Sequence, residues 1–170
     1  MERINKSIFM EHFKKGTWTK NTYIVSELTR RNGDVIADQF TLQNRIHAES
    51  QCITRLKQTI SVDEVVSLTW YISWTPCNVC ADEIIAFLHQ YPNVTLQIHA
   101  ARVYYHENQL MREGLRRLRD NNVAISIMGW RDYVSLWQTY GDSTEEIRRN
   151  EVYEGNPLDF EDILTTILQQ

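Results

Sequence analysis

The 170-residue chain is predicted to adopt an α/β fold, with a five-stranded mixed sheet and about six helices on both faces. Two observations support this prediction. Two segments of alternating apolar and polar residues flank Asn32-Gly33, and three later strand-like segments are separated by segments of helical periodicity. A hairpin needs only a tight turn, whereas strand–helix–strand units give parallel pairs by right-handed crossovers. The sheet should therefore contain both kinds of pairing.

The first elements are a helix, a hairpin and a second helix. The opening "MERINKSIFMEHFKK" mixes charged with apolar residues and has no signal-peptide h-region, so we expect an amphipathic helix there. The hairpin joins "NTYIVSELTRR" to "DVIADQFTL", and its Asn32-Gly33 pair predicts a type I′ turn. The segment "HAESQCITRLKQTI" has apolar residues at helical spacing, which predicts a helix beginning near His47.

The second half alternates strands with helices. Buried strands are predicted for "VVSLTWYIS", "NVTLQIHAARVYY" and "NVAISIM", and helices for "NVCADEIIAFLHQY", "QLMREGLRRLRDN" and "WRDYVSLWQTY". In the last of these helices, Trp130, Tyr133 and Trp137 share one face, which should pack on the sheet. A final short helix is predicted to start at Asn156-Pro157, an N-cap followed by proline, and to continue through "LDFEDILTTIL".

Composition indicates a single globular domain over residues 1–170, with no internal repeat or linker. No run of eighteen apolar residues is present, so we expect no membrane span. Residues 1–141 carry 16 basic and 14 acidic side chains, and residues 142–170 carry 2 and 8, so the net charge of −4 comes from an acidic C-terminal segment. A mildly basic body of this kind is compatible with a polyanionic substrate.

The chain contains two short motifs that carry chemistry, H-x-E at His47 and Glu49, and P-C-x-x-C at Pro76, Cys77 and Cys80. A C-x-x-C pair alone is compatible with a disulfide, a redox motif, a zinc site or two buried thiols. Catalytic zinc takes three protein ligands and leaves the fourth position to water. One imidazole and two thiolates supply three ligands, so the combined motifs predict one Zn²⁺ per chain.

The spacing of these residues suits the proposed zinc site. Pro76 fits the first turn of a helix, so Cys77 and Cys80 should lie near its N-terminus, where free N–H groups and the dipole favour thiolates. Their i, i+3 spacing puts both sulfurs on one helix face. Glu49 is then an extra carboxylate that a structural zinc site does not need. Beside a water on the metal, it can act as the proton shuttle.

The other interpretations of the cysteines are weaker. A redox motif has no use for H-x-E, and a structural zinc site lacks a fourth ligand. Cys52 is the one spare cysteine, and it falls within a predicted helix whose other members are core residues, so we expect a buried thiol. The odd count of three cysteines favours a reducing compartment. H-x-E with P-C-x-x-C is the signature of zinc-dependent deaminases.

From about Phe13 to Ile127 the chain resembles the AID/APOBEC family of polynucleotide cytidine deaminases. The resemblance rests on "NTYIVSEL", "HAE", "SWTPCNVCA", "FLHQYPNVTLQIHAARVYYH" and "GLRRLRDNNVAISIM". Free-nucleoside cytidine deaminases typically have Cys where His47 stands. The resemblance implies a cytidine-deaminase-like fold and hydrolysis of cytosine to uracil in single-stranded DNA or RNA. It also implies zinc on His47, Cys77 and Cys80, with Glu49 as the catalytic residue.

The same resemblance implies three residues around the target base. Trp74 in "SWTPC" matches a wall of the base pocket; the alternative is a plain core residue, and the two roles are compatible. Thr22 in "NTY" and Tyr104 in "ARVYY" match residues that flank the flipped cytosine. The loop after the fourth strand, "VYYHENQLMRE", is expected to border the nucleotide 5′ to that cytosine.

The family resemblance implies three further substrate contacts. Asn44 resembles a loop asparagine that touches the sugar, and Arg102 matches a basic position near the substrate. His106 is either a base-stacking contact or an exposed loop histidine. On the helix of residues 109–121, Arg112, Arg116 and Arg119 lie opposite an apolar face and either bind polynucleotide or are simply solvated.

Three functions remain open at this point. The first is an active single-stranded polynucleotide cytidine deaminase. The second is a zinc-stabilised nucleic-acid or protein-binding relative with little activity, although such a protein would not require Glu49. The third is a nucleoside deaminase, which H-x-E disfavours. The sequence is compatible with a homo-oligomer or an RNA-bridged assembly, and with the cytoplasm, the nucleus or both. It does not choose between DNA and RNA.

Overall fold

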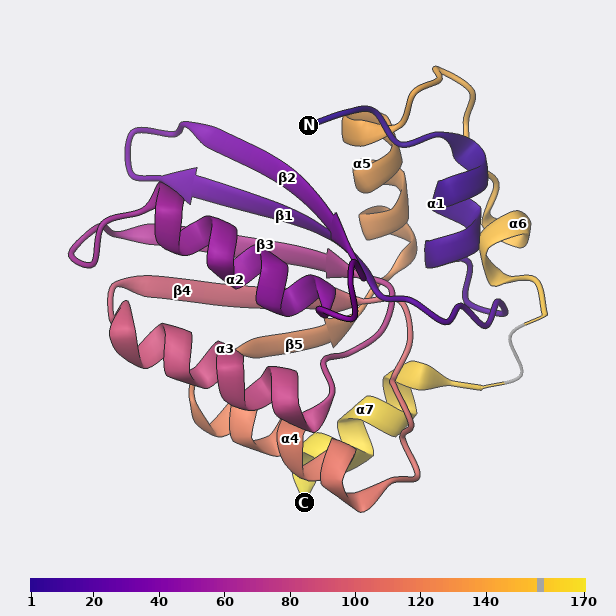
Figure 1. The fold of residues 1–170 in the computed structure, drawn as a ribbon. Coiled ribbons are helices and arrows are strands. Elements are labelled where there is room, and N and C mark those ends of the chain that lie inside the picture. The colour runs from indigo at the N-terminus through magenta and orange to yellow at the C-terminus, as the bar shows by residue number, and fades with distance from the viewer. Residues whose placement is uncertain (156–157) are drawn as a thin grey trace.

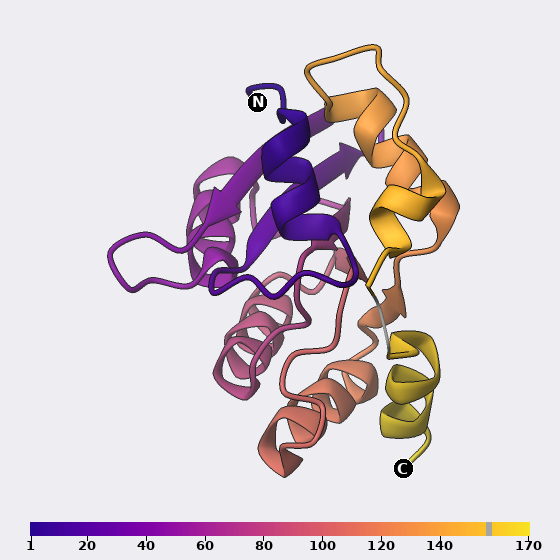
Figure 2. The same cartoon turned by 90° about the vertical axis from the view of Figure 1, so that its right-hand side faces the viewer.

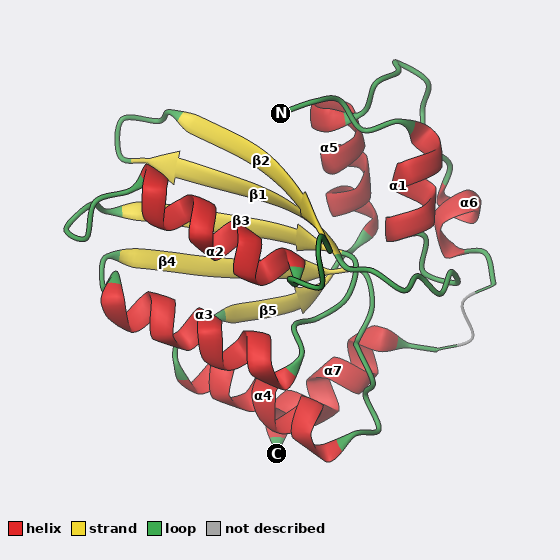
Figure 3. Ribbon diagram, viewed as in Figure 1, coloured by secondary structure: helices red, strands yellow, loops and turns green. Residues whose placement is uncertain are grey.

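The computed structural model describes residues 1–155 and 158–170, and it has one five-stranded mixed sheet in the order β2-β1-β3-β4-β5 (Figure 3). Strand β1 is antiparallel to both β2 and β3, and the pairs β3–β4 and β4–β5 are parallel. The predicted α/β class and mixed sheet are therefore confirmed. The strands are β1 Tyr23–Arg30, β2 Val35–Thr41, β3 Val66–Ile72, β4 Val94–Ala100 and β5 Ala124–Ile127.

Seven helices occur in the described part of the chain, one more than the sequence suggests. The additional helix is α6, which has five residues and is too short for periodicity to reveal it. The helices are α1 Lys6–Phe13, α2 Ala48–Thr59, α3 Asn78–Gln90, α4 Gln109–Asp120, α5 Trp130–Tyr140, α6 Arg149–Tyr153 and α7 Phe160–Gln169.

The helices form two groups around the sheet (Figures 1 and 2). Helices α2, α3, α4 and α7 share one hydrophobic cluster with the sheet, and α1, α5 and α6 share another. Alternate residues of β1 serve the two clusters, because successive side chains of a strand point to opposite faces. Ile24 and Leu28 belong to the first cluster, and Tyr23 and Val25 to the second. Tyr133 and Trp137 are buried in the second cluster, as expected.

The turn predicted for the hairpin is wrong. The β1–β2 hairpin does not have a type I′ turn, because Gly33 has φ +88° while Asn32 is not left-handed. The Gly33 N–H donates to the Arg30 carbonyl and the Arg30 N–H donates to Asp34, so the loop has three residues and ends in a left-handed glycine. The last helix begins at Phe160, with Asp159 as its N-cap. The predicted start at 156–157 lies outside the described residues.

The arginine face of α4 has a structural partner. The guanidinium of Arg119 donates to the Leu168 carbonyl, and Arg112 and Arg116 donate to the Gln170 side chain at 3.3 and 3.4 Å. These contacts place positive charge at the C-terminal end of α7, where it complements the helix dipole. None of the helices in residues 1–155 and 158–170 is both long and apolar enough to cross a bilayer.

Candidate active site

The residues of H-x-E and P-C-x-x-C meet where α2 and α3 begin. His47 is the N-cap residue of α2, and its side chain makes no capping bond. Cys77 is the N-cap of α3, and its sulfur accepts from the Cys80 N–H at 3.5 Å. Pro76 therefore precedes the N-cap and does not occupy the first helical turn as predicted. The helix still begins where expected, since the Cys77 sulfur satisfies one of the free N–H groups.

The spacing of the three donor atoms fits a zinc ion. His47 Nδ1 lies 3.2 Å from Cys80 Sγ and 3.8 Å from Cys77 Sγ, and all three donor atoms are within 4.8 Å of one another. Ligands held about 2.0–2.3 Å from a tetrahedral ion stand roughly 3.3–3.8 Å apart. One nitrogen and two sulfurs also match the donor types that zinc prefers. This group can therefore hold a metal through three protein atoms.

Glu49 lies in the first turn of α2 and is 2% exposed. Its Oε2 atom is buried and has no hydrogen-bond partner among the described residues. Burial raises the pKa of this carboxyl group to about 7. A buried, unpaired carboxylate oxygen is costly in a folded protein unless a ligand or water satisfies it. The unpaired oxygen beside the three donor atoms is thus a second sign that a polar group belongs there.

The two cysteines differ in their affinity for a proton. A hydrogen bond from the Cys80 thiol lowers the pKa of Cys77 to about 5, and the N–H groups of Cys80 and Val79 at the start of α3 act in the same direction. The pKa of Cys80 is raised, chiefly because its proton is shared with Cys77. The first turn of α3 therefore favours at least one thiolate. Cys52 is fully buried outside this group, as predicted, and burial raises the pKa of its thiol.

A cavity of about 110 Å³ opens beside the metal-ligand group. It is lined by Thr22, Trp74 and Tyr104, three of the residues expected to surround the target base, together with His47, Glu49 and Cys77. Residues Lys20, Asn21, Leu42, Ala48 and Thr75 complete its lining. The structure thus brings three residues, which the family resemblance predicts as substrate contacts, next to the carboxylate of Glu49.

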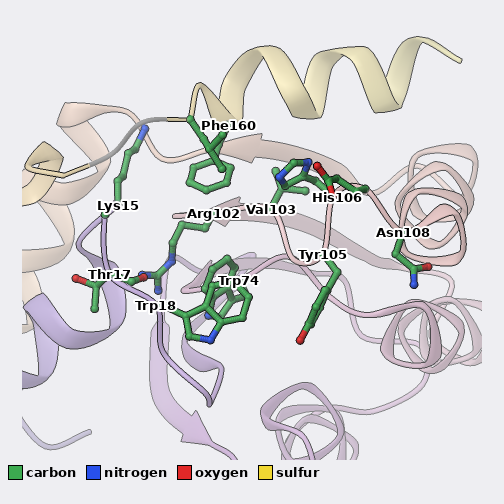
Figure 4. Close-up of a pocket in the computed structure, with 13 residues that line it drawn as sticks. Lys15, Thr17, Trp18, Trp74, Arg102, Val103, Tyr105, His106, Asn108 and Phe160 are labelled. Carbon is green, nitrogen blue, oxygen red and sulfur yellow. The ribbon is translucent and has the colours of Figure 1, made fainter.

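Trp74 also lines a second cavity, of about 280 Å³, whose lining residues Figure 4 shows. Its indole N–H donates to the Thr19 carbonyl at 3.2 Å and to the Thr19 hydroxyl at 3.1 Å, and the residue is 4% exposed. Trp74 is therefore both a core residue and a wall, so the two interpretations of this residue are compatible. His106 lines the second cavity and is separate from the first.

Trp18 is a site residue that the sequence pattern did not reveal. It is 63% exposed, and its ring lies edge-on to Trp74 at 4.9 Å and to Tyr105 at 5.9 Å. Tyr105 is itself 53% exposed, so these two aromatic rings border the second cavity from two different loops. An exposed tryptophan in an irregular segment has no periodicity to mark it. Trp18 joins the site only because the two loops meet in space.

Besides His106, the predicted substrate residues Asn44 and Arg102 also lie away from the first cavity. Asn44 is exposed in a tight turn between Gln43 and Ile46, where it has φ 51° and Arg45 has φ 66°, and it lines neither cavity. Arg102 borders the second cavity but is only 1% exposed. Its guanidinium donates to backbone carbonyls and stacks on Trp74, with 4.4 Å from its carbon to the ring centroid.

Comparison with known proteins identifies relatives along most of the chain. Residues 2–152 match the family model described as APOBEC3, cytosine deaminase domain. The chain is 29% identical over 154 residues to the cat (Felis catus) DNA dC->dU-editing enzyme APOBEC-3Ca, covering 84% of this chain and 80% of that protein. It is 33% identical over 144 residues to the opossum (Monodelphis domestica) C->U-editing enzyme APOBEC-1, covering 82% of this chain and 60% of that protein.

A third relative is the orangutan (Pongo pygmaeus) DNA dC->dU-editing enzyme APOBEC-3H, 29% identical over 140 residues. That match covers 81% of this chain and 66% of the relative. The APOBEC-1 and APOBEC-3H relatives therefore carry sequence beyond the matched part, whereas most of the cat protein is matched. Within this chain, α7 falls outside the span of the family model.

Proposed function

The chain belongs to the APOBEC3 cytosine deaminase domain family, and from that premise we propose that it hydrolyses cytosine to uracil in single-stranded polynucleotide. The family resemblance inferred from the sequence motifs is confirmed. The observation that carries the proposal is Glu49, buried beside His47, Cys77 and Cys80 at the wall of a cavity. A purely binding role would require neither the carboxylate nor its unpaired oxygen.

In this proposal His47 Nδ1, Cys77 Sγ and Cys80 Sγ hold one Zn²⁺ per chain. When bound, zinc supplies a Lewis acid that activates water near neutral pH. Glu49 then moves the proton from the attacking water to the leaving amine, so that the C4–N bond breaks, a C4–O bond forms and ammonia departs. Burial raises the pKa of this carboxyl group above its ordinary value, the direction that suits a group that accepts a proton and then returns it.

The first cavity is proposed to receive the target base. Trp74 and Tyr104 supply aromatic walls, and Thr22 supplies a hydroxyl on the opposite loop. A cytosine in a duplex is buried in the stack, so the enzyme must take a strand that is already single or flip the nucleotide out. The cavity is small enough to hold one base, and the neighbouring exposed aromatic rings of Trp18 and Tyr105 suit stacking with further bases.

The other three residues predicted from the family resemblance lie outside the first cavity, so their proposed roles are less direct. His106 borders the second cavity, so it is proposed to contact a nucleotide next to the target cytosine and not the cytosine itself. Asn44 could meet the sugar only at the rim, since its turn is exposed. Arg102 is proposed to act through the backbone it binds, because its guanidinium is almost completely buried.

We also propose that residues 1–170 form one cytidine deaminase domain with an acidic C-terminal segment at 142–170. Phe160, Leu164 and Ile167 of α7 lie in the same hydrophobic cluster as α2, α3 and α4, which supports a single unit. Single-stranded DNA or RNA is the proposed partner, with a cytoplasmic or nuclear location. Assembly through a second copy or through bridging RNA remains a prediction.

The substrate class is tested by offering purified protein a C-containing DNA oligonucleotide, the matching RNA oligonucleotide and free cytidine. Uracil in an oligonucleotide but not in the nucleoside supports the proposal. Conversion of free cytidine at a comparable rate would favour a nucleoside deaminase. Binding of either oligonucleotide without any uracil, in protein that holds its zinc, would favour a binding protein with the same fold.

A further inference from the structure

Arg102 is a buried cation whose hydrogen bonds within the described part of the chain all go to backbone carbonyls. Nε donates to Ser73 at 3.2 Å, and Nη1 donates to Lys14 at 2.8 Å and also to Thr17. Nη2 donates to His12. No carboxylate among residues 1–155 and 158–170 forms an ion pair with this guanidinium. Burial accordingly lowers its pKa to about 10, still far above neutrality.

The charge is compensated by the end of helix α1. The carbonyl of His12 is one of the last four of that helix, which have no partner within it, and these carbonyls carry the negative end of the helix dipole. Lys14 is the C-cap residue of α1. A guanidinium has a planar set of five donors and can meet several carbonyls at once, whereas an ammonium has three donors on one atom. The contact therefore requires arginine.

Three segments of the site converge on this one side chain. Arg102 follows β4, and its own carbonyl accepts from the Thr75 N–H at 3.0 Å. Ser73 belongs to the loop between β3 and α3 that also carries Trp74. The residues 14–22, hereafter the α1–β1 loop, join α1 to β1 and supply Trp18 to the second cavity and Thr22 to the first.

We infer that Arg102 is a positioning residue, which fixes the α1–β1 loop so that the loop forms one wall of each cavity. This rests on the proposed function only where substrate binding is concerned. Arg102 holds the loop at Lys14 and Thr17, and Trp74 holds it at Thr19 through its indole N–H. Because the guanidinium lies on the Trp74 ring, the two anchors support each other.

The loop is tested directly by limited trypsin digestion of zinc-loaded protein, with cleavage after Lys15 and Lys20 compared with cleavage after Lys57 in α2. Arg102→Lys should speed loop cleavage at least about tenfold relative to Lys57, the scale of losing one charged hydrogen bond. Zinc content should stay at the wild-type value. Equal acceleration at Lys57 would mean general unfolding and would overturn the inference, as would an unchanged ratio.

Arg119→Lys is the matched control. Arg119 also donates to a carbonyl at a helix C-terminus, but that helix is α7, away from the α1–β1 loop. The loop should be cleaved in this variant as in the wild type. If Arg119→Lys sped cleavage of the loop as strongly as Arg102→Lys, the loss of any arginine bound at a helix C-terminus would have the same effect. The inference would then fail.

A second variant approaches the same contact from the loop side. Gly16 lies between the two residues whose carbonyls receive the Nη1 bonds, and a Cβ atom there would stand 2.3 Å from the Glu154 carbonyl oxygen. Gly16→Ala must therefore push the loop and the backbone of Glu154 and Gly155 apart, while leaving Arg102 in place. It should reproduce the faster loop cleavage, including in the case that Arg102→Lys does not fold. A wild-type digestion pattern would overturn the inference.

Kinetics then separate positioning from a general structural role. With an oligonucleotide substrate, Arg102→Lys and Gly16→Ala should each raise KM at least about fivefold. The value of kcat should stay within about twofold of wild type, because the zinc ligands and Glu49 are untouched. A lower kcat at unchanged KM would indicate a smaller fraction of folded enzyme and would contradict the inference. Digestion does not depend on turnover, so it would still test the position of the loop in a protein without deaminase activity.

Discussion

The Nδ1 atom of His47 lies 3.2 Å from the sulfur of Cys80, although the two residues are 33 positions apart in the chain. The two side chains meet because α2 and α3 begin side by side on one face of the sheet, at the end of β3. His47 and Cys77 are the N-cap residues of these helices, and Cys80 lies in the first turn of α3, where N–H groups are free and a thiolate is favoured. The arrangement converts two short sequence motifs into one ligand group.

Zinc content gives the first prediction. The purified protein should hold about one zinc ion, and Cys77→Ala or Cys80→Ala should lose most of it, because two remaining protein ligands bind zinc poorly. Metal binding and folding are coupled, so the same variants should melt at lower temperature. Elemental analysis and thermal unfolding measure the two effects.

Cys52→Ala is the matched control for both cysteine variants. Cys52 is fully buried but lies outside the ligand group, so this variant should lose stability without losing zinc. A full zinc complement in Cys77→Ala or Cys80→Ala would contradict the ligand assignment. Loss of zinc from Cys52→Ala would do the same, because general destabilisation would then explain all three results.

His12 provides a prediction about pH. It is 9% exposed, its Nδ1 atom has no partner among the described residues, and its ring stacks on Tyr23 at 4.7 Å. Burial lowers its pKa below the ordinary 6.5, with Arg102 acting in the same direction. Below pH 6.5 the unfolded chain therefore takes up a proton that the native protein resists, so stability falls as the pH falls, by at most about 1.4 kcal/mol per pH unit.

Urea unfolding at pH 7.5 and pH 5.5 measures this effect. The loss of unfolding free energy between the two values should be smaller in His12→Gln than in the wild type. An identical pH dependence in His12→Gln and the wild type would show that His12 titrates alike in both states.

The loop after β4 gives a prediction about sequence context. Tyr105, His106 and Glu107 line the second cavity, and stacking on aromatic faces is worth roughly 1–3 kcal/mol per base without discriminating between bases. Edge contacts in this loop should therefore set the preference for the base 5′ to the cytosine. Replacing residues 105–107 by Gly-Ser-Gly should keep zinc and flatten that preference across a set of oligonucleotides.

The replacement must end before Asn108, which has to stay unchanged. Its side chain caps α4 by accepting from Leu110 and Met111, and loss of such a cap costs about 1 kcal/mol. Tyr104→Ala is the companion variant, and it should lower activity in every sequence context because it removes a wall of the first cavity. An intact 5′ preference after the loop exchange would move specificity to the α1–β1 loop or the turn around Asn44.

The sequence predicted the features that depend on local pattern. Helix α5 begins and ends at the expected residues, because the spacing of Trp130, Tyr133 and Trp137 marks one buried face. His47, Cys77 and Cys80 could be predicted as one group of zinc ligands because no other use of them explains Glu49 as well, and the structure places their donor atoms within 4.8 Å of one another. The prediction that Thr22, Trp74 and Tyr104 surround the target base came from family resemblance alone, and the structure gathers the three residues in one cavity.

Other features depend on contacts between distant segments. The burial of Arg102 follows from carbonyls some 85 to 90 positions earlier in the chain, which no local pattern records. Trp18 becomes part of the site only because its loop meets Tyr105. The turn at Asn32-Gly33 took a three-residue form, since the residue before the glycine keeps an ordinary φ and its side chain accepts from the Asp34 N–H.

The measurement that tests the central claim most directly compares wild type with Glu49→Gln on a single-stranded C-containing oligonucleotide. Glutamine is nearly isosteric and leaves all three donor atoms in place, so zinc content and thermal stability should stay near wild type. Uracil formation should fall at least about 100-fold, the scale of a positioned acid–base group. A zinc-loaded Glu49→Gln protein that forms uracil at the wild-type rate would contradict the proposal, because the proton would then be carried by another group.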